Sequence, residues 1–500
     1  MADILLAHSY HLAYDPKQVR KMQPYPPLGT LYAATALREH GISVAVFDSM
    51  LQDPVSAFPE MLLQQQPRIL AIYEDDFNFL SKMCLTRMRE LAWQLARTAR
   101  VAGAIVIAHG SDATDHAEAY LNNGVDFVLV GEAEQSLVDL CDSILQGGEL
   151  PRNIPGVIHL EPTGNPVQSS VHSSRNMNWK NLPMPARELI DLAPYREAWL
   201  SAHGYFSASV VASRGCPYRC NWCAKPISGN KFQLRAPEQV AAEICELKNR
   251  YGVQHIWFGD DIFALNQHWV QAFADAMEAL ECRLPFKIQS RADLMTRETV
   301  RGLKRAGCAE VWMGVESGSQ KVLDIMDKGL RVPQIEDARA RLGEAGIHAC
   351  YFLQFGYPGE QWDDIRQTID LVRRTRPHDI GVSFSYPLPG TVFFDRVRDQ
   401  IGSKSNWTDS DDLCLMFTAA YKDEFYLALR NALHAEVDSW RDGSAANAVD
   451  CSALWQQVFA LEQTSRNSAA TVLADTVLAD HDVPARGRPQ LVRLQGVPAH

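Results

Sequence analysis

The stretch VASRGCPYRCNWC, residues 211–223, decides the fold and the chemistry expected of this chain. It carries three thiols, Cys216, Cys220 and Cys223, in the spacing CxxxCxxC, directly after an apolar run that predicts a strand. Gly215 lets the backbone come close to a bulky ligand. We therefore expect a ligand-bearing loop at the end of a strand.

The three thiols allow two other interpretations. Their spacing would also place three small hydrophobic side chains on one face of a core helix, but Arg219, Asn221 and Trp222 give no coherent apolar face. A structural zinc site generally takes four protein ligands, and the nearest further Cys or His is His203. Three thiolates suit a cubane iron–sulfur cluster that keeps one iron open for a substrate-like ligand.

Strand and helix patterns alternate for six units from Ser207 onward. The predicted strands centre near Val210, Ile256, Ile288, Val311, Phe352 and Val382, and the predicted helices span 237–250, 266–281, 297–306, 319–327, 333–345 and 362–375. Six consecutive units fit a partial barrel, because each right-handed crossover can continue in the same rotational sense. Reactive groups are then expected at the carboxyl ends of the strands.

The first ~150 residues show the same alternation with five apolar runs. The predicted strands are 4–7, 44–47, 69–72, 104–107 and 126–130, and the predicted helices include 28–39, 85–99 and 137–145. This pattern predicts a doubly wound parallel sheet, in which ligands bind beyond the carboxyl ends of the strands near the switch in strand order.

The length of 500 residues predicts about three domains, at roughly 100–200 residues per domain. The fold class is α/β. The expected parts are a Rossmann-like domain (1–150), a hairpin and linker (151–200), a partial (β/α)6 TIM-like barrel (201–400) and a helical C-terminal region (401–500) with helices at 425–437 and 454–461 and a loose tail over the last twenty residues.

Composition narrows the class of partner. The chain has 48 Lys and Arg against 60 Asp and Glu, a net charge of −12. It therefore lacks the excess positive charge with which proteins bind nucleic acid. We expect a small-molecule or peptide substrate. No window approaches the ~18 uninterrupted apolar residues of a membrane span, and the first residues lack a signal-peptide head, so we expect a cytoplasmic protein. Most of the 11 cysteines are placed singly, unlike a secreted disulfide framework.

CxxxCxxC after the first strand of a six-unit partial barrel resembles the radical S-adenosylmethionine (SAM) superfamily. The resemblance implies that Cys216, Cys220 and Cys223 hold a [4Fe–4S] cluster whose fourth iron takes the amino and carboxylate groups of SAM. Reductive cleavage of SAM then yields a 5′-deoxyadenosyl radical that abstracts hydrogen. Family members usually carry an aromatic near the adenine, just before the third cysteine, and Trp222 stands there. A separate reductant such as flavodoxin or ferredoxin is also implied.

Motifs at the later strand ends resemble the family's SAM contacts. Gly259 and Asp260 follow the second strand, where the family meets the ammonium group of SAM; the alternative is that Asp260 caps the next helix. Ser290 and Arg291 end the third strand, where a cation meets the methionyl carboxylate. The alternative for Arg291 is a surface ion pair.

Two further motifs complete the set. Glu316 and Ser317 lie in the sequence GVESGS, which resembles the family's ribose motif, because a carboxylate can accept hydrogen bonds from both ribose hydroxyls. The alternative for Glu316 is helix capping. Gly356 opens a turn that resembles the family's adenine-side turn. No catalytic residue is predicted.

The arrangement over about residues 1 to 395 resembles the cobalamin-binding branch of the superfamily, which includes the anaerobic magnesium-protoporphyrin ester cyclase type. Segments 26–32, 131–134 and 182–187 match short signatures usual at those places. We expect a corrin to lie against the carboxyl edge of the first sheet, with small residues of 109–114 lining a slot for its nucleotide tail. The family more often has two glycines and then a histidine at this place, so His109 and Asp112 are departures from its pattern.

The cobalt-ligating motif DxHxxG of classical cobalamin mutases is absent. The chain has Ala7, His8, Ser9, Tyr10 and His11 at that place, so we assign no cobalt ligand. A lone histidine is more often structural.

The chemistry most often implied by the resemblance is methylation of an unactivated carbon or of phosphorus, with one SAM recharging cobalamin and a second giving the radical. One alternative is radical oxidation or ring formation without methyl transfer. Another is that the first domain has lost cobalamin and serves as a platform for substrate or partner. A third is a corrinoid- or metal-sensing binding protein without catalysis. The sequence does not identify the substrate or the oligomeric state.

Overall fold

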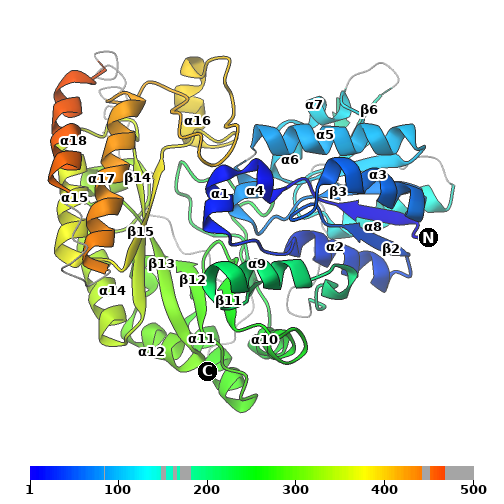
Figure 1. The fold of residues 1–500 in the computed structure, drawn as a ribbon, viewed down its shortest axis with the longest axis horizontal. Coiled ribbons are helices and arrows are strands. Elements are labelled where there is room, and N and C mark those ends of the chain that lie inside the picture. The colour runs from blue at the N-terminus through cyan, green and yellow to red at the C-terminus, as the bar shows by residue number, and fades with distance from the viewer. Residues whose placement is uncertain (84, 148–153, 162–165, 169–181, 442–450, 468–500) are drawn as a thin grey trace.

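A computed structural model describes residues 1–83, 85–147, 154–161, 166–168, 182–441 and 451–467. It contains two large sheets, each flanked by helices, and the two units lie side by side (Figure 1). The tail predicted over the last twenty residues lies outside the described residues.

The first sheet is doubly wound, as predicted. Its parallel strands are β1 (Ile4–Ala7), β2 (Val44–Phe47), β3 (Ile69–Tyr73), β4 (Ile105–His109) and β5 (Phe127–Leu129), in the order β2-β1-β3-β4-β5. This order places the switch point between β1 and β3. Strands β6 (Val157–Leu160) and β7 (Pro166–Gln168) form the predicted hairpin, and β6 pairs antiparallel with β5, so the hairpin extends this sheet.

Alternating residues of the first sheet enter two separate apolar cores. In β1, Ile4 and Leu6 belong to one core and Leu5 and Ala7 to the other, because successive side chains point to opposite faces. The helices of this unit are α1 (Pro16–Lys21), α2 (Leu28–Glu39), α3 (Pro54–Gln65), α4 (Phe79–Lys82), α5 (Thr86–Val101), α6 (Ser111–Asp115), α7 (Ala117–Leu121) and α8 (Glu134–Leu145).

The second sheet has six parallel strands whose spatial order follows the chain. They are β8 (Ser207–Val210), β11 (His255–Phe258), β12 (Phe286–Ser290), β13 (Cys308–Glu316), β14 (His348–Phe355) and β15 (Asp379–Phe384). The connecting helices are α10 (Pro237–Tyr251), α11 (Gln267–Ala279), α12 (Arg297–Ala306), α13 (Gln320–Ile325), α14 (Val332–Glu344) and α15 (Trp362–Thr375). This is the strand order of the TIM-barrel-like fold that the sequence predicts.

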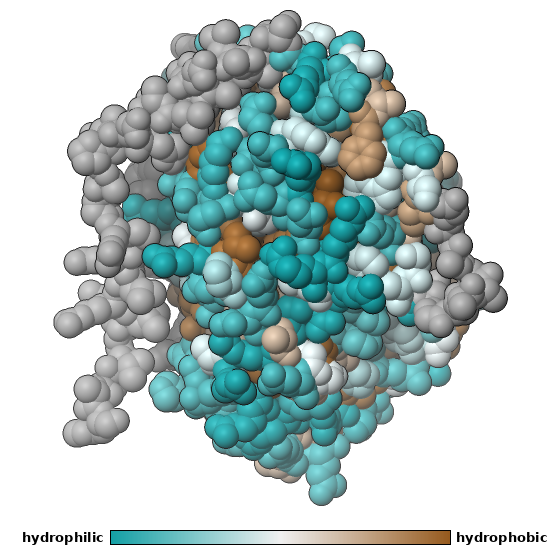
Figure 2. Space-filling model, turned by 90° about the vertical axis from the view of Figure 1, so that its left-hand side faces the viewer, coloured by the Kyte–Doolittle hydropathy of each residue, from teal (hydrophilic) through white to brown (hydrophobic). Residues whose placement is uncertain are grey.

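The remaining elements join or cover these units. They are the short hairpin β9 (Ser213–Arg214) and β10 (Gln233–Leu234), helices α9 (Ala193–His203), α16 (Val392–Val397), α17 (Asp423–Arg441) and α18 (Ser452–Thr464), and 3₁₀ turns at Leu12–Tyr14, Arg187–Leu189, Ala292–Leu294 and Arg398–Gln400. Helices α15, α17 and α18 form a mainly hydrophilic face with small, separate apolar spots (Figure 2).

Helix α9 was not predicted. Its buried Trp199 donates to Pro24 O at 2.7 Å, and Tyr195 donates to Asp48 at 2.7 Å, which packs this segment between the two units. Cys245 and Cys282, which the sequence analysis treats as single, form a disulfide with their Cα atoms 5.2 Å apart. Within the described part of the chain, no helix is long and apolar enough to cross a membrane.

Candidate functional site

The cysteine segment is a loop between β9 and β10, at the carboxyl end of β8. Residues 216–223 are not helical, so the alternative of a core helix face is wrong. Gly215 has φ +81°, and a Cβ there would overlap Lys231 O and crowd Ser228. Glycine is therefore required where the loop leaves β9.

Cys216, Cys220 and Cys223 are free, partly exposed thiols that influence one another electrostatically. Burial raises the pKa of Cys216, and it raises that of Cys223 to about 12, so binding a cluster must displace protons from these thiols. Among the described residues, no three His, Cys, Asp or Glu side chains lie close enough to hold one metal ion. A cubane binds each sulfur through a different iron, so its three thiols need not converge on a single ion.

The segment after α13 braces the cysteine loop. Asn221 N donates to Met326 O at 3.2 Å, and Asn221 Nδ2 donates to Ile325 O at 2.7 Å and Asp327 Oδ2 at 2.9 Å. The Tyr357 hydroxyl donates to Asn221 Oδ1 at 2.5 Å. Asn221 thus ties the loop to the ends of two later strand–helix units.

Trp222 and Glu316 meet through a residue that the sequence analysis missed, Lys328. Lys328 Nζ lies 2.7 Å from Glu316 Oε1 and 5.8 Å from the Trp222 ring centroid. Burial alone lowers the pKa of Lys328, but Glu316 and then Cys220 raise it above its ordinary value. The Trp222 Nε1 donor is buried and has no hydrogen-bond partner among the described residues, which fits a polar group binding beside the cysteines.

Glu316 does not cap a helix in this structure, because its carboxylate faces Lys328. Its backbone has φ +60°, which is strained for a residue with a side chain. A Cβ on Gly314 would lie 2.8 Å from both Glu316 Oε1 and Lys328 Nζ. The glycine therefore leaves room for this buried ion pair.

Arg291 is buried, so the ion pair that it forms is not the surface pair of the alternative interpretation. The guanidinium pairs with Asp293 at 2.9 Å, donates to Lys328 O at 2.9 Å and lies 3.9 Å from the Tyr218 ring centroid. Arg291 thus belongs to the same group of side chains as Trp222, Glu316 and the cysteines.

Asp260 binds the segment that leads from β8 into the cysteine loop. It accepts hydrogen bonds from Ala212 N, at 3.0 Å, and from the Ser213 hydroxyl, and burial raises its pKa to about 7. The capping alternative is wrong, because α11 is capped by Asn266. A Cβ on Gly259 would lie 3.5 Å from Phe77 of the first unit and from Val211 after β8, so Gly259 lies where the two units meet.

The other predicted residues are engaged in local structure. Ser290 Oγ donates to Phe263 O at 2.7 Å, and Ser317 Oγ accepts from Ser319 N at 3.1 Å. Gly356 has φ +82°, and its N–H donates to Glu360 at 2.7 Å. These three residues shape strand ends and do not point a free group at the cysteines.

The carboxyl edge of the first sheet is mostly paired internally. His8 lies 2.9 Å from Asp48, and Glu74 accepts from Ser9 N at 2.9 Å. In the predicted tail slot, Asp112 accepts from Arg89 Nε at 2.7 Å and from the Tyr120 hydroxyl at 2.8 Å.

Within the described part of the chain, a few buried groups at this edge have no hydrogen-bond partner. They are the Tyr73 hydroxyl, the Asp76 carboxylate, whose Oδ2 lies 3.9 Å from His109 Nε2, and His109 Nδ1. They supply the donors and acceptors that the amide side chains of a corrin require, so this edge fits a polar cofactor.

Two ion pairs join the edge of the first sheet to the cysteine loop. Arg214 pairs with Glu134 at 2.6 Å, and both side chains are at most 4% exposed. Lys82 pairs with Asp261 at 2.5 Å, and its charge also acts on Cys223. The carboxyl ends of both sheets therefore meet at the cysteines.

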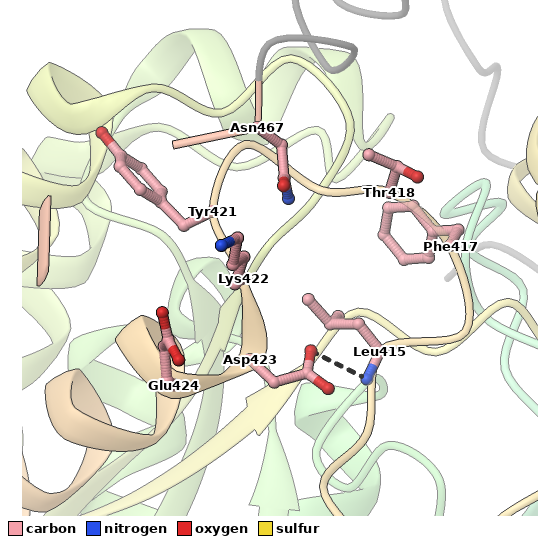
Figure 3. A pocket seen from close by; sticks show the side chains of 8 residues that line it. All are labelled: Leu415, Phe417, Thr418, Tyr421, Lys422, Asp423, Glu424 and Asn467. Atoms are coloured by element: carbon pink, nitrogen blue, oxygen red, sulfur yellow. Dashed lines mark hydrogen bonds between the residues drawn. The ribbon is translucent and has the colours of Figure 1, made fainter. Parts of the chain in front are cut away.

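A pocket of about 380 Å³ lies in the C-terminal region. It is lined by Leu415, Phe417, Thr418, Tyr421, Lys422, Asp423, Glu424 and Asn467, and Leu415 N donates to Asp423 across it (Figure 3). None of the residues predicted for the site lines this pocket.

A six-stranded parallel sheet whose first loop carries three free cysteines is the arrangement that the sequence predicts. Residues 210–372 match the family model of the radical SAM superfamily, so this part of the chain is a radical SAM domain. Enzymes of this superfamily use a [4Fe–4S] cluster and SAM, which agrees with the predicted cofactors.

Similar proteins cover more of the chain. An uncharacterized methyltransferase of Pyrococcus horikoshii is 25% identical over 389 residues, 76% of this chain and 81% of that protein. The anaerobic magnesium-protoporphyrin IX monomethyl ester cyclase of Cereibacter sphaeroides is 24% identical over 402 residues, 75% of this chain and 61% of that protein. The structure of OxsB with aqua-cobalamin and SAM bound covers 96% of this chain and 75% of its own, at 16% identity and TM-score 0.68, a likeness of fold.

Proposed function

We propose that this chain is a cobalamin-dependent radical SAM methyltransferase that methylates an unactivated carbon or phosphorus centre. The observation that carries the proposal is the meeting of two strand-end edges: three free thiols end the first strand of one sheet, beside the carboxyl edge of a doubly wound sheet. The names of the methyltransferase relative and of the cobalamin-bound structure support it.

We assign the parts of the chain accordingly. Residues 1–150 bind cobalamin, 151–200 connect, 201–400 form the radical SAM partial barrel and 401–500 cover it. When bound, the cluster supplies an electron to SAM and cobalamin supplies the methyl group. The reductant is a separate protein such as flavodoxin or ferredoxin, and the location is cytoplasmic.

The chain's own residues hold these groups. Cys216, Cys220 and Cys223 bind the cluster, and Trp222, Arg291 and Glu316 contact SAM. Arg291 and Lys328 place two buried cations beside the cysteines, where SAM carries a carboxylate. We propose that Gly259, Asp260, Ser290, Ser317 and Gly356 shape the loops around these contacts.

At the first sheet, Tyr73, Asp76 and His109 are the groups proposed to meet the polar side chains of cobalamin. No histidine is proposed as a cobalt ligand, because His8 is bonded to Asp48 and His11 Nδ1 to Ser49 O at 2.8 Å.

Anaerobic reconstitution with iron and sulfide, followed by reduction with SAM, tests the proposal. We expect iron–sulfur absorption and formation of 5′-deoxyadenosine, with added hydroxocobalamin retained by the protein on gel filtration. If zinc accompanies the purified protein and no 5′-deoxyadenosine forms, a metal-binding protein without catalysis replaces the enzyme. If the cluster is active but cobalamin is not retained, the first unit is a platform only.

A second candidate is radical oxidation or ring formation without methyl transfer. The similarity to the ester cyclase over 402 residues favours it. Product mass distinguishes the two: a gain of one methylene unit supports methylation, whereas a loss of hydrogens or a gain of oxygen supports the second candidate.

A further inference from the structure

The cysteine loop has little regular backbone structure of its own. Pro217 has no N–H to donate, and in the described part of the chain the one backbone hydrogen bond between residues 216–223 joins Cys223 N to Cys220 O at 3.2 Å. Neither a helix nor a sheet ladder therefore fixes the three thiols relative to one another. Side chains must hold the loop in place.

Lys225 holds the loop from inside. Its Nζ donates to Cys216 O at 3.1 Å, to Tyr218 O, and to Asn230 Oδ1 at 2.5 Å. A lysine ammonium group has three N–H donors, so each of them has an acceptor. The acceptors lie nine and seven residues before Lys225 and five residues after it, so the side chain ties both halves of the loop to one point.

The charge of Lys225 acts on the thiols. Burial raises the pKa of Cys216 and of Cys223, and the Lys225 ammonium group acts on both in the opposite direction. Its three acceptors are neutral oxygens, and among the described residues it forms no ion pair with a carboxylate. Lys225 therefore places a positive charge beside the cysteines that no acidic side chain offsets.

The other cations near the thiols are offset or exposed. Lys82 acts on Cys223, and Arg291 and Lys328 act on Cys220. Each of them lies beside a carboxylate: Lys82 2.5 Å from Asp261, which itself acts on Cys216 and Cys223, Arg291 2.9 Å from Asp293, and Lys328 2.7 Å from Glu316. Arg219 and Lys231, the remaining cations of the loop, are exposed, so solvent screens their charges. Lys225 is thus the cation that is both fixed by its bonds and not paired with an acid.

A fixed positive charge beside an iron–sulfur cluster favours its reduced form, because reduction adds a negative charge. We propose that Lys225 is a positioning residue for the cluster: it closes the cysteine loop around its ammonium group, and its charge favours the reduced cluster. The inference rests on the proposed function, which assigns the three cysteines as the cluster ligands. The electron comes from the reductant, and no bond forms or breaks in this step.

A redox titration of the reconstituted full chain without SAM, followed by electron paramagnetic resonance, measures the effect of the charge. A unit charge about 12 Å from a group, at an effective dielectric constant of about 20, changes an equilibrium constant by about tenfold. Lys225 Nζ is bonded to the backbone of Cys216, so it lies within that distance of the thiol. Lys225→Met should lower the ratio of reduced to oxidised cluster at a fixed potential by about tenfold, a shift of about 59 mV in the midpoint of a one-electron couple.

Lys225→Arg and Lys231→Met are the matched variants. Lys225→Arg keeps the charge, so its midpoint potential should stay near that of the wild type. Lys231→Met removes an exposed cation of the same loop and should leave the midpoint unchanged. A merely structural role for Lys225 would lower the cluster content and leave the midpoint of the clusters that form. An unchanged midpoint in Lys225→Met, or an equal fall in either matched variant, overturns the inference.

Cleavage of the metal-free chain by chymotrypsin tests the closure of the loop. The protease cuts after aromatic residues such as Tyr218 and Trp222, and mass spectrometry follows the loss of each bond. Removing the bonds of a charged donor should raise the population of the open loop, so we expect cleavage about tenfold faster in Lys225→Met than in the wild type or Lys231→Met. Equal rates overturn the inference, and these rates decide it if Lys225→Met takes up no cluster.

The two proposals fail separately. If the wild type takes up no cluster, the cysteine ligands of the proposed function fall, whereas cleavage still measures whether Lys225 holds the loop. If the wild type takes up a cluster and cleaves SAM while Lys225→Met keeps its midpoint and cleavage rate, only the role of Lys225 falls.

Discussion

The two sheets present their carboxyl edges to one another, and the edges differ in how their polar groups are used. At the first edge, His8 bonds Asp48 and Asp112 bonds Arg89, so most charges are satisfied within the chain. At the second edge, the three cysteines are free and, among the described residues, the Trp222 indole N–H has no hydrogen-bond partner. Parallel strands place loops at both edges. Within the described ranges, the first edge keeps unpartnered polar atoms on Tyr73, Asp76 and His109, whereas the second keeps free thiols that can ligate a metal cluster. Topology therefore supplies the location, and the local pairing decides what each edge can bind.

The largest expected effect is that of removing a cysteine, because the free thiols are what distinguishes the second edge from the first. Cys220→Ala leaves two thiols, which cannot hold a cubane, so iron, labile sulfide and 5′-deoxyadenosine formation should fall to background. Iron assay and anaerobic turnover measure this. The thermal midpoint of the metal-free protein should stay within error, because Cys220 is a partly exposed loop residue.

Cys414→Ala is the matched control, since Cys414 is another free, partly exposed thiol. It should retain the cluster. Full cluster content in Cys220→Ala would remove the basis for distinguishing the two edges.

Lys328→Met tests whether the second edge depends on its buried cation. The substitution leaves Glu316 buried and unpaired, and breaking such a pair costs about 3–5 kcal/mol in the free energy of unfolding. We expect that loss in denaturant melts of the metal-free protein, together with a fall of at least about tenfold in SAM cleavage. Lys328→Arg should recover part of both.

The control for Lys328 is Lys404→Met, because both members of the Lys404–Asp412 ion pair are partly exposed. Its effect on stability should be about 0–1 kcal/mol. Equal stability of Lys328→Met and the wild type would show that Glu316 does not need this partner.

Glu134→Gln tests the Arg214–Glu134 ion pair that links the two edges. It leaves Arg214 without its carboxylate in a buried place, so the free energy of unfolding should fall by about 3 kcal/mol. Glu246→Gln, in the exposed pair with Arg250, should cost less than about 1 kcal/mol. Cluster content in Glu134→Gln distinguishes weaker contact between the two edges from loss of the cluster site. A stability loss no larger than that of Glu246→Gln would contradict the role of the Arg214–Glu134 pair.

The sequence was sufficient wherever a pattern is local. Helix α2 was predicted at its observed bounds, and all eleven predicted strands of the two parallel sheets formed, because apolar periodicity encodes which face is buried. The cysteine loop was found from the spacing of the thiols together with the residues that flank them. The bracing residues were not found: Arg214 meets Glu134 80 positions away, and Asn221 meets Asp327 106 positions away. Lys328 has no local signal either, because its partners come from two other strand ends. Asp260 was identified as important, but its bonds to Ala212 and Ser213 depend on strand pairing.

The smallest expected effect is that of Glu360→Gln. It tests whether a buried polar group at the second edge acts on the stability of the fold rather than on the cluster. Glu360 lies in the turn after β14, its Oε2 accepts from Gly356 N, and its Oε1 has no hydrogen-bond partner in the described ranges. Burial raises its pKa from 4.5 to about 8, so the folded protein holds this proton more tightly than the unfolded chain does. The stability that this group contributes is complete below pH 4.5 and is lost as the pH rises through about 8. Glu360→Gln should flatten that decline, which has a maximum slope of about 1.4 kcal/mol per pH unit, in denaturant melts of the metal-free protein. The exposed Glu344→Gln should follow the wild type, and an unchanged slope in Glu360→Gln would assign the decline to other groups, such as Asp260 beneath the cysteine loop.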